Sequence, residues 1–260
     1  MKYVITSVSV EMKKLFHSKV PYITFIFMLL IPFFCGFFMF ILKNPTTAEK
    51  LGFITSKAQL TTGGTADWIS YISLLTQAIS IGGIIVFGFI TSWVFGREYS
   101  DRTIKDLLAL PIPREVIVYA KFIVISILCI ILSIIVYLVG ITVGFSLGLE
   151  GYTGIVMKQG SLNFFICSIL TIILSTPVGL IASIGRGYLS PIAFLILMIF
   201  LSQIIAMTGY GIYFPWAIPA LLSGVSGEIS FLLSSYILVI ITGLVGIVST
   251  SLWWQYKDIK

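Results

Sequence analysis

Long apolar runs, separated by short polar connections, make up most of the chain. Six of these runs reach about 20 residues, the length of helix that crosses the hydrocarbon core of a bilayer. They lie at Val20–Leu42, Ile72–Phe95, Phe122–Leu147, Leu162–Ile184, Leu189–Thr208 and Phe231–Trp254. They do not alternate apolar with polar residues, as the strands of a membrane β-barrel would. The pattern therefore predicts an all-α membrane protein with six transmembrane helices, forming a single domain over residues 1–260.

A shorter amphipathic segment precedes the first run. Within residues 3–18, the apolar residues Val8, Met12, Leu15 and Phe16 recur at the spacing of one helix face, with charged residues between them. Such a segment favours the plane of the membrane surface over a transmembrane position. We therefore expect an interfacial helix that leads into the first span.

Composition and charge support the membrane assignment and orient the chain. Only 10% of the residues are charged, whereas soluble domains carry roughly 25%, so the charge cannot cover a water-facing surface. Twelve of the 16 Lys and Arg residues fall on the side that holds both termini. The positive-inside rule then places both termini in the cytoplasm. The net charge of +6 is accounted for by anionic lipid and predicts no nucleic-acid partner.

The connection between the second and third spans is unusually rich in charge. Nine of the 26 charged residues of the chain fall within Gly96–Lys121. Ser100 is placed to cap a short helix over Asp101–Leu110, which Pro111 would end. Ile104, Leu107 and Leu108 would form an apolar stripe on this helix. We expect the stripe to insert into a groove of a soluble partner; the alternative is that it lies flat on the lipid.

The spans themselves carry little chemistry. Their interiors hold no acidic, basic or histidine residue, and Lys121 and Arg186 lie at span ends, where long side chains can extend to water. No metal or cofactor pattern and no phosphate-binding GxxxxGK[ST] loop is present. The sequence therefore predicts a protein that is not an enzyme. Energy for any work that it does would arrive from outside the bundle, and a separate ATPase would need the charged connection as its docking site.

Small residues recur at every fourth position in two spans, which allows close helix packing. One face has Gly140, Gly144 and Gly148, and the other includes Gly179. This pattern is explained by packing within the chain or by a mobile helix pair. Pro177 should kink the fourth span, and the aromatic, proline-rich stretch 209–228 indicates a short half-inserted element before the last span.

The charged connection resembles the cytoplasmic segment of ABC-2 type permeases, the membrane subunits of ATP-driven exporters. The matching residues are Glu98, Thr103, Leu107–Leu108, Pro111, Arg114 and Lys121. The family usually has Gly where this chain has Arg102. Six spans, cytoplasmic termini and the amphipathic first helix also match. Within the family, the chain is most similar to permeases of bacitracin-resistance and lantibiotic-immunity exporters.

The resemblance implies a bacterial plasma-membrane exporter with two ATPase copies and a second, identical or different, permease copy. It implies a hydrophobic or amphipathic cargo, such as a peptide antibiotic or a lipid, and no cofactor on this chain. It assigns ATPase coupling to Glu98, Asp101, Arg102, Thr103, Ile104, Leu107, Leu108 and Arg114. The alternative is a stand-alone channel or scaffold protein without an ATPase partner.

Overall fold

The computed structural model describes residues 2–44, 66–104, 107, 109, 111–224 and 233–256. Six spans in this part of the chain are long and apolar enough to cross a membrane, which confirms the predicted count. The helices are α1 (Lys2–Phe16), α2 (Val20–Lys43), α5 (Trp68–Ser100), α7 (Arg114–Ser146), α8 (Gly154–Leu174), α9 (Thr176–Gly185), α10 (Leu189–Met207), η1 (Tyr210–Tyr213), η2 (Pro215–Ala217), α11 (Ile218–Leu222) and α12 (Leu233–Tyr256).

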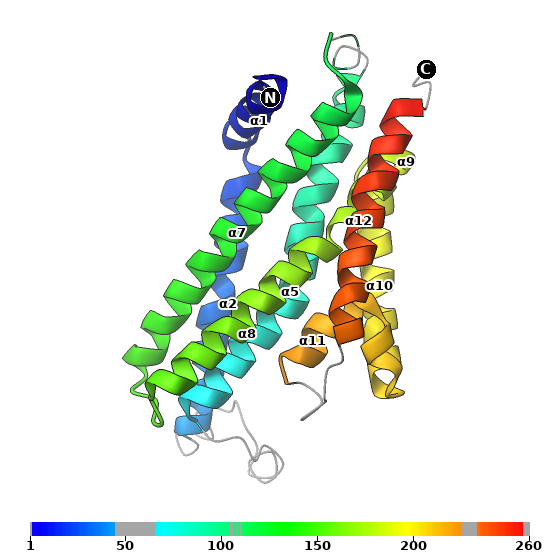
Figure 1. Cartoon of the computed structure of the whole chain (residues 1–260). Coiled ribbons are helices and arrows are strands. Elements are labelled where there is room, and N and C mark those ends of the chain that lie inside the picture. Colours follow the sequence, from blue (N-terminus) through cyan, green and yellow to red (C-terminus); the bar gives the residue numbers. More distant parts are fainter. Residues whose placement is uncertain are drawn as a thin grey trace.

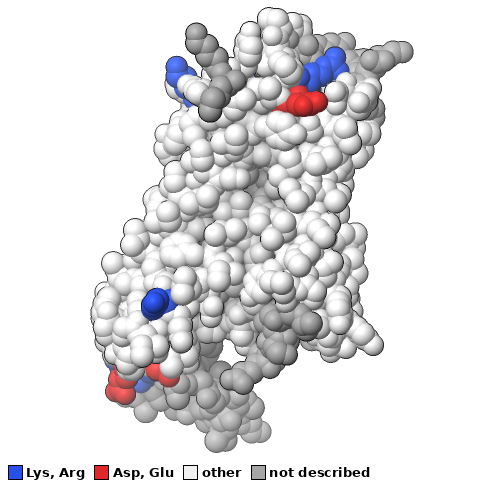
Figure 2. Space-filling view, viewed as in Figure 1, with Lys and Arg blue, Asp and Glu red and all other residues white. Residues whose placement is uncertain are grey.

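The long helices run side by side as one bundle (Figure 1). The amphipathic helix α1 and the end of α12 lie at the same end of the bundle as the connection between α5 and α7. Helix α11 and the start of α8 lie towards the opposite end. We refer to these as the terminal end and the far end. On the face shown in Figure 2, the charged side chains lie towards these two ends, and the middle is uncharged.

Helix α5 is the most enclosed of the six spans and α10 the least. The α5 side chains Ile79, Phe87 and Ile90 are fully buried, because α2, α7, α8, α9 and α10 all pack against α5. At 33 residues it is about 50 Å long, which exceeds the ~30 Å hydrocarbon core. The ends of α5 therefore extend beyond the apolar layer, and the polar groups of the molecule gather around them.

The glycine face of α7 packs on α5 within the same chain. A Cβ on Gly140 would lie 2.6 Å from a methyl group of Leu75, and one on Gly144 would lie 2.7 Å from the ring of Trp68. The close approach lets the Tyr71 hydroxyl donate to the Gly140 carbonyl at 2.8 Å. Gly148 is different, because it lies beyond α7 and has a positive φ of 58°.

The fourth span is broken at Ser175 into α8 and α9, as the prediction of a kink near Pro177 required. Helix α12 packs against the break through Gly246, where an added Cβ would lie 2.6 Å from the Pro177 nitrogen. The Thr176 hydroxyl donates to the Gly243 carbonyl at 2.9 Å. Gly179 meets the rings of Phe95 and Phe122, so this small-residue face also packs within the chain.

The stretch that follows α10 folds back onto the bundle. It forms η1, η2 and α11, whose residues Trp216, Ile218 and Leu221 are buried. Trp216 and Ile218 belong to a small apolar core with residues of α8, α10 and α12. A short helical element is therefore present over residues 210–222, its partial insertion into the membrane stays a prediction, and residues 225–228 of the predicted stretch lie outside the described residues.

A buried ion cluster beside the α5–α7 connection as the candidate functional site

Four charged side chains from three helices meet near the terminal end. Glu11 comes from α1, Arg97 and Glu98 from the last turn of α5, and Lys121 from the early part of α7. Lys121 Nζ lies 2.8 Å from Glu98 Oε1 and 3.1 Å from Glu11 Oε2. Arg97 Nη2 lies 2.6 Å from the same Glu11 oxygen. We call these four residues the ion cluster; Lys14 lies at its edge, 3.2 Å from Glu11.

The ion cluster is buried. Lys121 is 0% exposed, Glu98 2% and Glu11 3%. Burying a lone charge costs several kcal/mol, so such groups persist only when they are paired and hydrogen-bonded. Here two carboxylates face two cations, and every pair joins different helices except Arg97 with Glu98. The cluster therefore specifies how α1 sits on α5 and α7.

The carboxyl group of Glu11 stays ionised in this setting. Burial by itself would raise its pKa, but the attraction of Lys121, Lys14 and Arg97 outweighs burial and lowers the pKa from its ordinary value of 4.5. A group with a lowered pKa in the folded state stabilises the fold above its unfolded pKa. That stability is lost as the pH falls below about 4.5 through the folded pKa, so the tie between α1 and the spans holds at neutral pH.

The expectation that Lys121 extends to water at a span end is wrong. Helix α7 begins at Arg114 rather than at Phe122, so Lys121 lies about two turns inside it. Helix α1 also packs against this part of α7 and brings Glu11 to the lysine. Because the ammonium group is enclosed in this way, its charge is balanced by two carboxylates instead of being hydrated by water.

The predicted start of the coupling helix is also wrong. Ser100 is the last residue of α5, and Asp101 is its C-cap rather than the first residue of a new helix. Arg102 then adopts a left-handed conformation with φ 57°, which is how many helices end. A new helical turn begins at Thr103, whose carbonyl accepts from the Leu107 N–H at 3.0 Å. The predicted start was wrong because α5 continues past Phe95, the predicted end of the second span, and carries Arg97 and Glu98 into the ion cluster.

The connection is fastened directly to the ion cluster. Thr103 Oγ1 donates to Glu98 Oε2 at 2.7 Å. Ile104 is only 6% exposed and belongs to the main apolar core, and Leu107 packs against that core. Two members of the predicted docking stripe therefore face inward, towards their own chain. Leu108, the third member, lies outside the described residues.

The remaining predicted coupling residues lie at the surface or bind elsewhere. Asp101, Arg102 and Thr103 are exposed. Asp101 and Thr103 line a solvent-open groove of about 550 Å³, together with Lys14, His17 and Trp93 among others. Arg114 does not reach Glu98: its Nη1 donates to the Trp254 and Gln255 carbonyls at 3.2 and 3.3 Å. It therefore caps the C-terminal end of α12.

Reading the sequence missed Glu11, Arg97 and Lys121 as members of one site. The signal in the sequence was an acidic residue on the apolar side of the first helix. Glu11 lies next to Met12 and four residues before Leu15, so it shares their helix face, in a segment with few acidic groups. Its partners are 86 and 110 residues away. Only the packing of α1 on the bundle brings them together.

Comparison with known proteins places this arrangement in a family. The model of the ABC-2 family transporter protein matches residues 7–202, a range that includes the whole ion cluster and the α5–α7 connection. The chain belongs to the ABC-2 transporter family. It is therefore a multi-pass transport protein of the bacterial cell membrane.

The chain is also similar to a curated protein, the bacitracin transport permease protein BCRB of Bacillus licheniformis. It is 28% identical over 178 residues, which cover 68% of this chain and 86% of the relative. The likeness of this ABC-2 family chain to a permease supports the assignment of a transport subunit.

Proposed function

We propose that the chain is the permease subunit of an ATP-driven exporter and works with two copies of a separate ATPase and a second permease copy. The ion cluster carries this proposal. It joins the α5–α7 connection to three helices through buried charges, so a force applied to the connection moves α1, α5 and α7 together. Family membership supports a transport role, and the Lys/Arg distribution supports a cytoplasmic position for the connection.

In this proposal the ATPase touches the exposed part of the connection rather than its apolar stripe. Ile104 is buried in the chain's own core, so it positions the connection. Asp101 lines the groove and the next residue, Arg102, is exposed, so both can form charged contacts with the partner. Glu98 receives the Thr103 hydroxyl and passes movement of the connection to Lys121 and α7.

The proposed cargo is a hydrophobic or amphipathic molecule, such as a peptide antibiotic or a lipid, moved outward from the cytoplasm or the inner leaflet. The relative's name refers to bacitracin transport, which supports this class of cargo. The largely uncharged span interiors also favour molecules with apolar bodies over ions.

Two matched variants test the ATPase contact. Arg102 and Arg186 are both exposed and both left-handed, with φ 57° and 52°, and Asp is tolerated in that conformation. We expect Arg102→Asp to lower the amount of ATPase that co-purifies in mild detergent by roughly tenfold, as for a central interface charge. Arg186→Asp, at the α9–α10 turn, should leave co-purification unchanged.

The experiment begins with affinity purification of the unaltered chain from its native membrane, followed by mass spectrometry. A stoichiometric ATPase supports the proposal. A folded chain that brings no ATPase with it would contradict the proposal and favour the stand-alone channel or scaffold. Equal loss of ATPase from both variants would contradict the contact at Arg102.

A further inference from the structure

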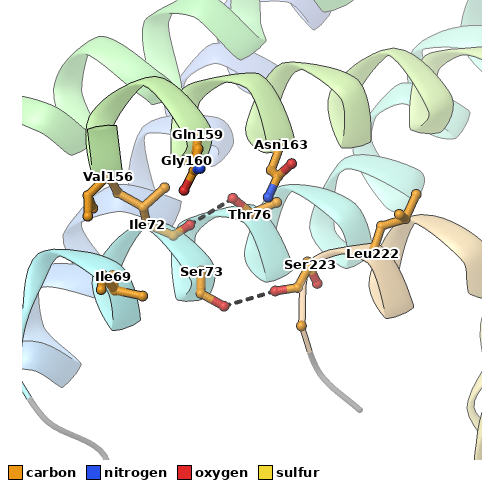
Figure 3. A pocket seen from close by; sticks show the side chains of 11 residues that line it. Ile69, Ile72, Ser73, Thr76, Val156, Gln159, Gly160, Asn163, Leu222 and Ser223 are labelled. Atoms are coloured by element: carbon orange, nitrogen blue, oxygen red, sulfur yellow. Dashed lines mark hydrogen bonds between the residues drawn. The ribbon is translucent and has the colours of Figure 1, made fainter. Parts of the chain in front are cut away.

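A polar cavity of about 290 Å³ lies near the far end, where α5, α8 and the end of α11 meet (Figure 3). Ser73 and Thr76 of α5 form one wall, and Gln159 and Asn163 of α8 form the facing wall. The end of α11 closes a third side, where the Ser223 carbonyl accepts from the Ser73 hydroxyl at 2.8 Å. The ion cluster and the α5–α7 connection contribute no residue to this cavity.

Two carboxamides in this cavity have unused hydrogen-bonding capacity. Gln159 and Asn163 lie one helical turn apart, and Figure 3 shows their amides directed from α8 towards Thr76. Both side chains are exposed, and among the described residues neither amide has a hydrogen-bond partner. The Thr76 hydroxyl, by contrast, donates to its own helix at the Ile72 carbonyl. Each amide offers two donors and an acceptor. The cavity therefore presents several polar atoms that a ligand can bind.

The cavity lies towards one end of the bundle rather than at its middle. Gln159 and Asn163 lie in the first half of α8 (Gly154–Leu174), about 7 and 13 Å from its start. The start of α8 lies towards the far end (Figure 1). Polar groups cost less to keep there than at the centre of the hydrocarbon.

The described lining residues also favour a chemical class, because none of their side chains is charged. Among these residues, a phosphate or carboxylate finds no cation to neutralise it. Ile69, Ile72, Val156 and Leu222 supply apolar surface beside the amides. An uncharged group that both donates and accepts hydrogen bonds, attached to an apolar body, matches this lining.

We propose that this cavity binds the uncharged, hydroxyl- or amide-bearing head group of an amphipathic molecule through Gln159 and Asn163. The proposal rests on the proposed transport function and deepens it, because it names the part of the cargo that the permease recognises. Gln159 and Asn163 supply the hydrogen bonds, and the apolar wall accommodates the start of the hydrocarbon chain. The molecule is therefore held near the far end of the bundle, with its polar end at the amides of α8.

The test uses the full-length chain in lipid nanodiscs and an alkyl glucoside that carries a photoreactive diazirine in its chain. Two comparison probes share the chain but carry a carboxylate or a trimethylammonium head group. After illumination, mass spectrometry locates the labelled peptides. We expect the glucoside to label peptides that contain Ile69–Thr76 or Val156–Asn163, and untagged glucoside to compete. Each charged probe should label these peptides at least about tenfold less, since neither pairs with the lining.

Variants separate binding from general disruption. Removing both amides in Gln159→Leu with Asn163→Leu should lower the specific labelling about tenfold. Gln203→Leu makes the same chemical change at an exposed position on α10 and should leave labelling unchanged. Asn163→Gln keeps an amide and should retain most of the labelling. Thermal unfolding of each variant checks that it is folded.

Equal labelling by the three probes, or labelling that the double variant does not reduce, would overturn the inference. The probe comparison on the unaltered chain decides the question even if the double variant fails to fold. ATPase co-purification is measured on the same preparations. A bound ATPase without selective labelling would contradict the cavity proposal but not the proposed function. Selective labelling without a bound ATPase would support the binding site and contradict the proposed exporter function.

Discussion

Arg102 stands where the resemblance to ABC-2 type permeases leads to the expectation of a glycine, and the structure shows the backbone conformation at this position. The residue ends α5 in a left-handed conformation, with its N–H donating to the Tyr99 carbonyl at 3.2 Å. Glycine adopts this conformation without the clash between Cβ and backbone that other residues incur. An arginine therefore stands where the backbone favours glycine, and its exposed side chain must contribute something other than stability.

The first prediction concerns this position. Arg102→Gly should raise the free energy of unfolding by about 1 kcal/mol, because it removes left-handed strain at a helix end. Asp101→Gly is the matched control: its φ is −84°, so glycine there relieves nothing and should be neutral or destabilising. Denaturation of both variants in mixed micelles measures the difference. A stability gain at Asp101 equal to that at Arg102 would contradict the explanation.

At the scale of elements, the spans were predictable and the packing of α1 was not. Apolar runs of membrane-spanning length need no tertiary information, so α2 and α10 match their predicted bounds within one residue. The end of α5 was misjudged because no glycine marks it and Ser100 imitates a helix start. Lys121 was misjudged because a lysine near a span end is normally solvated. Its true environment depends on α1, which meets it only in the folded bundle.

The second prediction tests how the ion cluster holds α1. Lys121→Met should cost about 3–5 kcal/mol of unfolding free energy, because it leaves Glu11 and Glu98 buried without their shared cation. Adding Glu11→Gln to this variant should recover part of the loss, since it restores the balance of charge. Thermal or chemical unfolding in detergent measures the three proteins.

Lys158→Met serves as the control for this series. Lys158 lies on a spanning helix but is exposed, so its loss should change stability by no more than about 0.5 kcal/mol. If Lys121→Met costs no more than Lys158→Met, the ion cluster does not hold α1 on the bundle.

At the scale of the whole molecule, the two ends of the bundle carry different chemistry. The terminal end holds the ion cluster, the connection and the groove, whereas the far end holds the uncharged cavity of Figure 3. Helix α5 contributes to both, through Arg97 and Glu98 at one end and Ser73 and Thr76 at the other. The two sites lie at opposite ends of the single helix α5, so a shift of α5 along its axis would displace residues of both sites.

The third prediction fixes which end faces the cytoplasm. Cys35, Cys129 and Cys167 are all buried, so an impermeant maleimide should not react with the unaltered chain. In intact cells, we expect the reagent to label Tyr152→Cys, at an exposed position of the far end, and not Arg102→Cys. Both should react after the membrane is opened. Labelling of Arg102→Cys in intact cells would reverse the orientation assigned to the chain.

The ion cluster also has a consequence for how the protein is made. Its members enter the chain in the order Glu11, Arg97, Glu98 and Lys121. During synthesis, two complete spans follow Glu11 before Arg97 is made, and the connection to the third span follows before Lys121 is made; until Arg97 is made, of these partners only Lys14, on the same helix, can pair with Glu11. The nascent chain can close this network only when the third span is delivered to the bilayer. Completion of the first half of the bundle is therefore marked by a chemical event, the burial of Lys121 between two carboxylates.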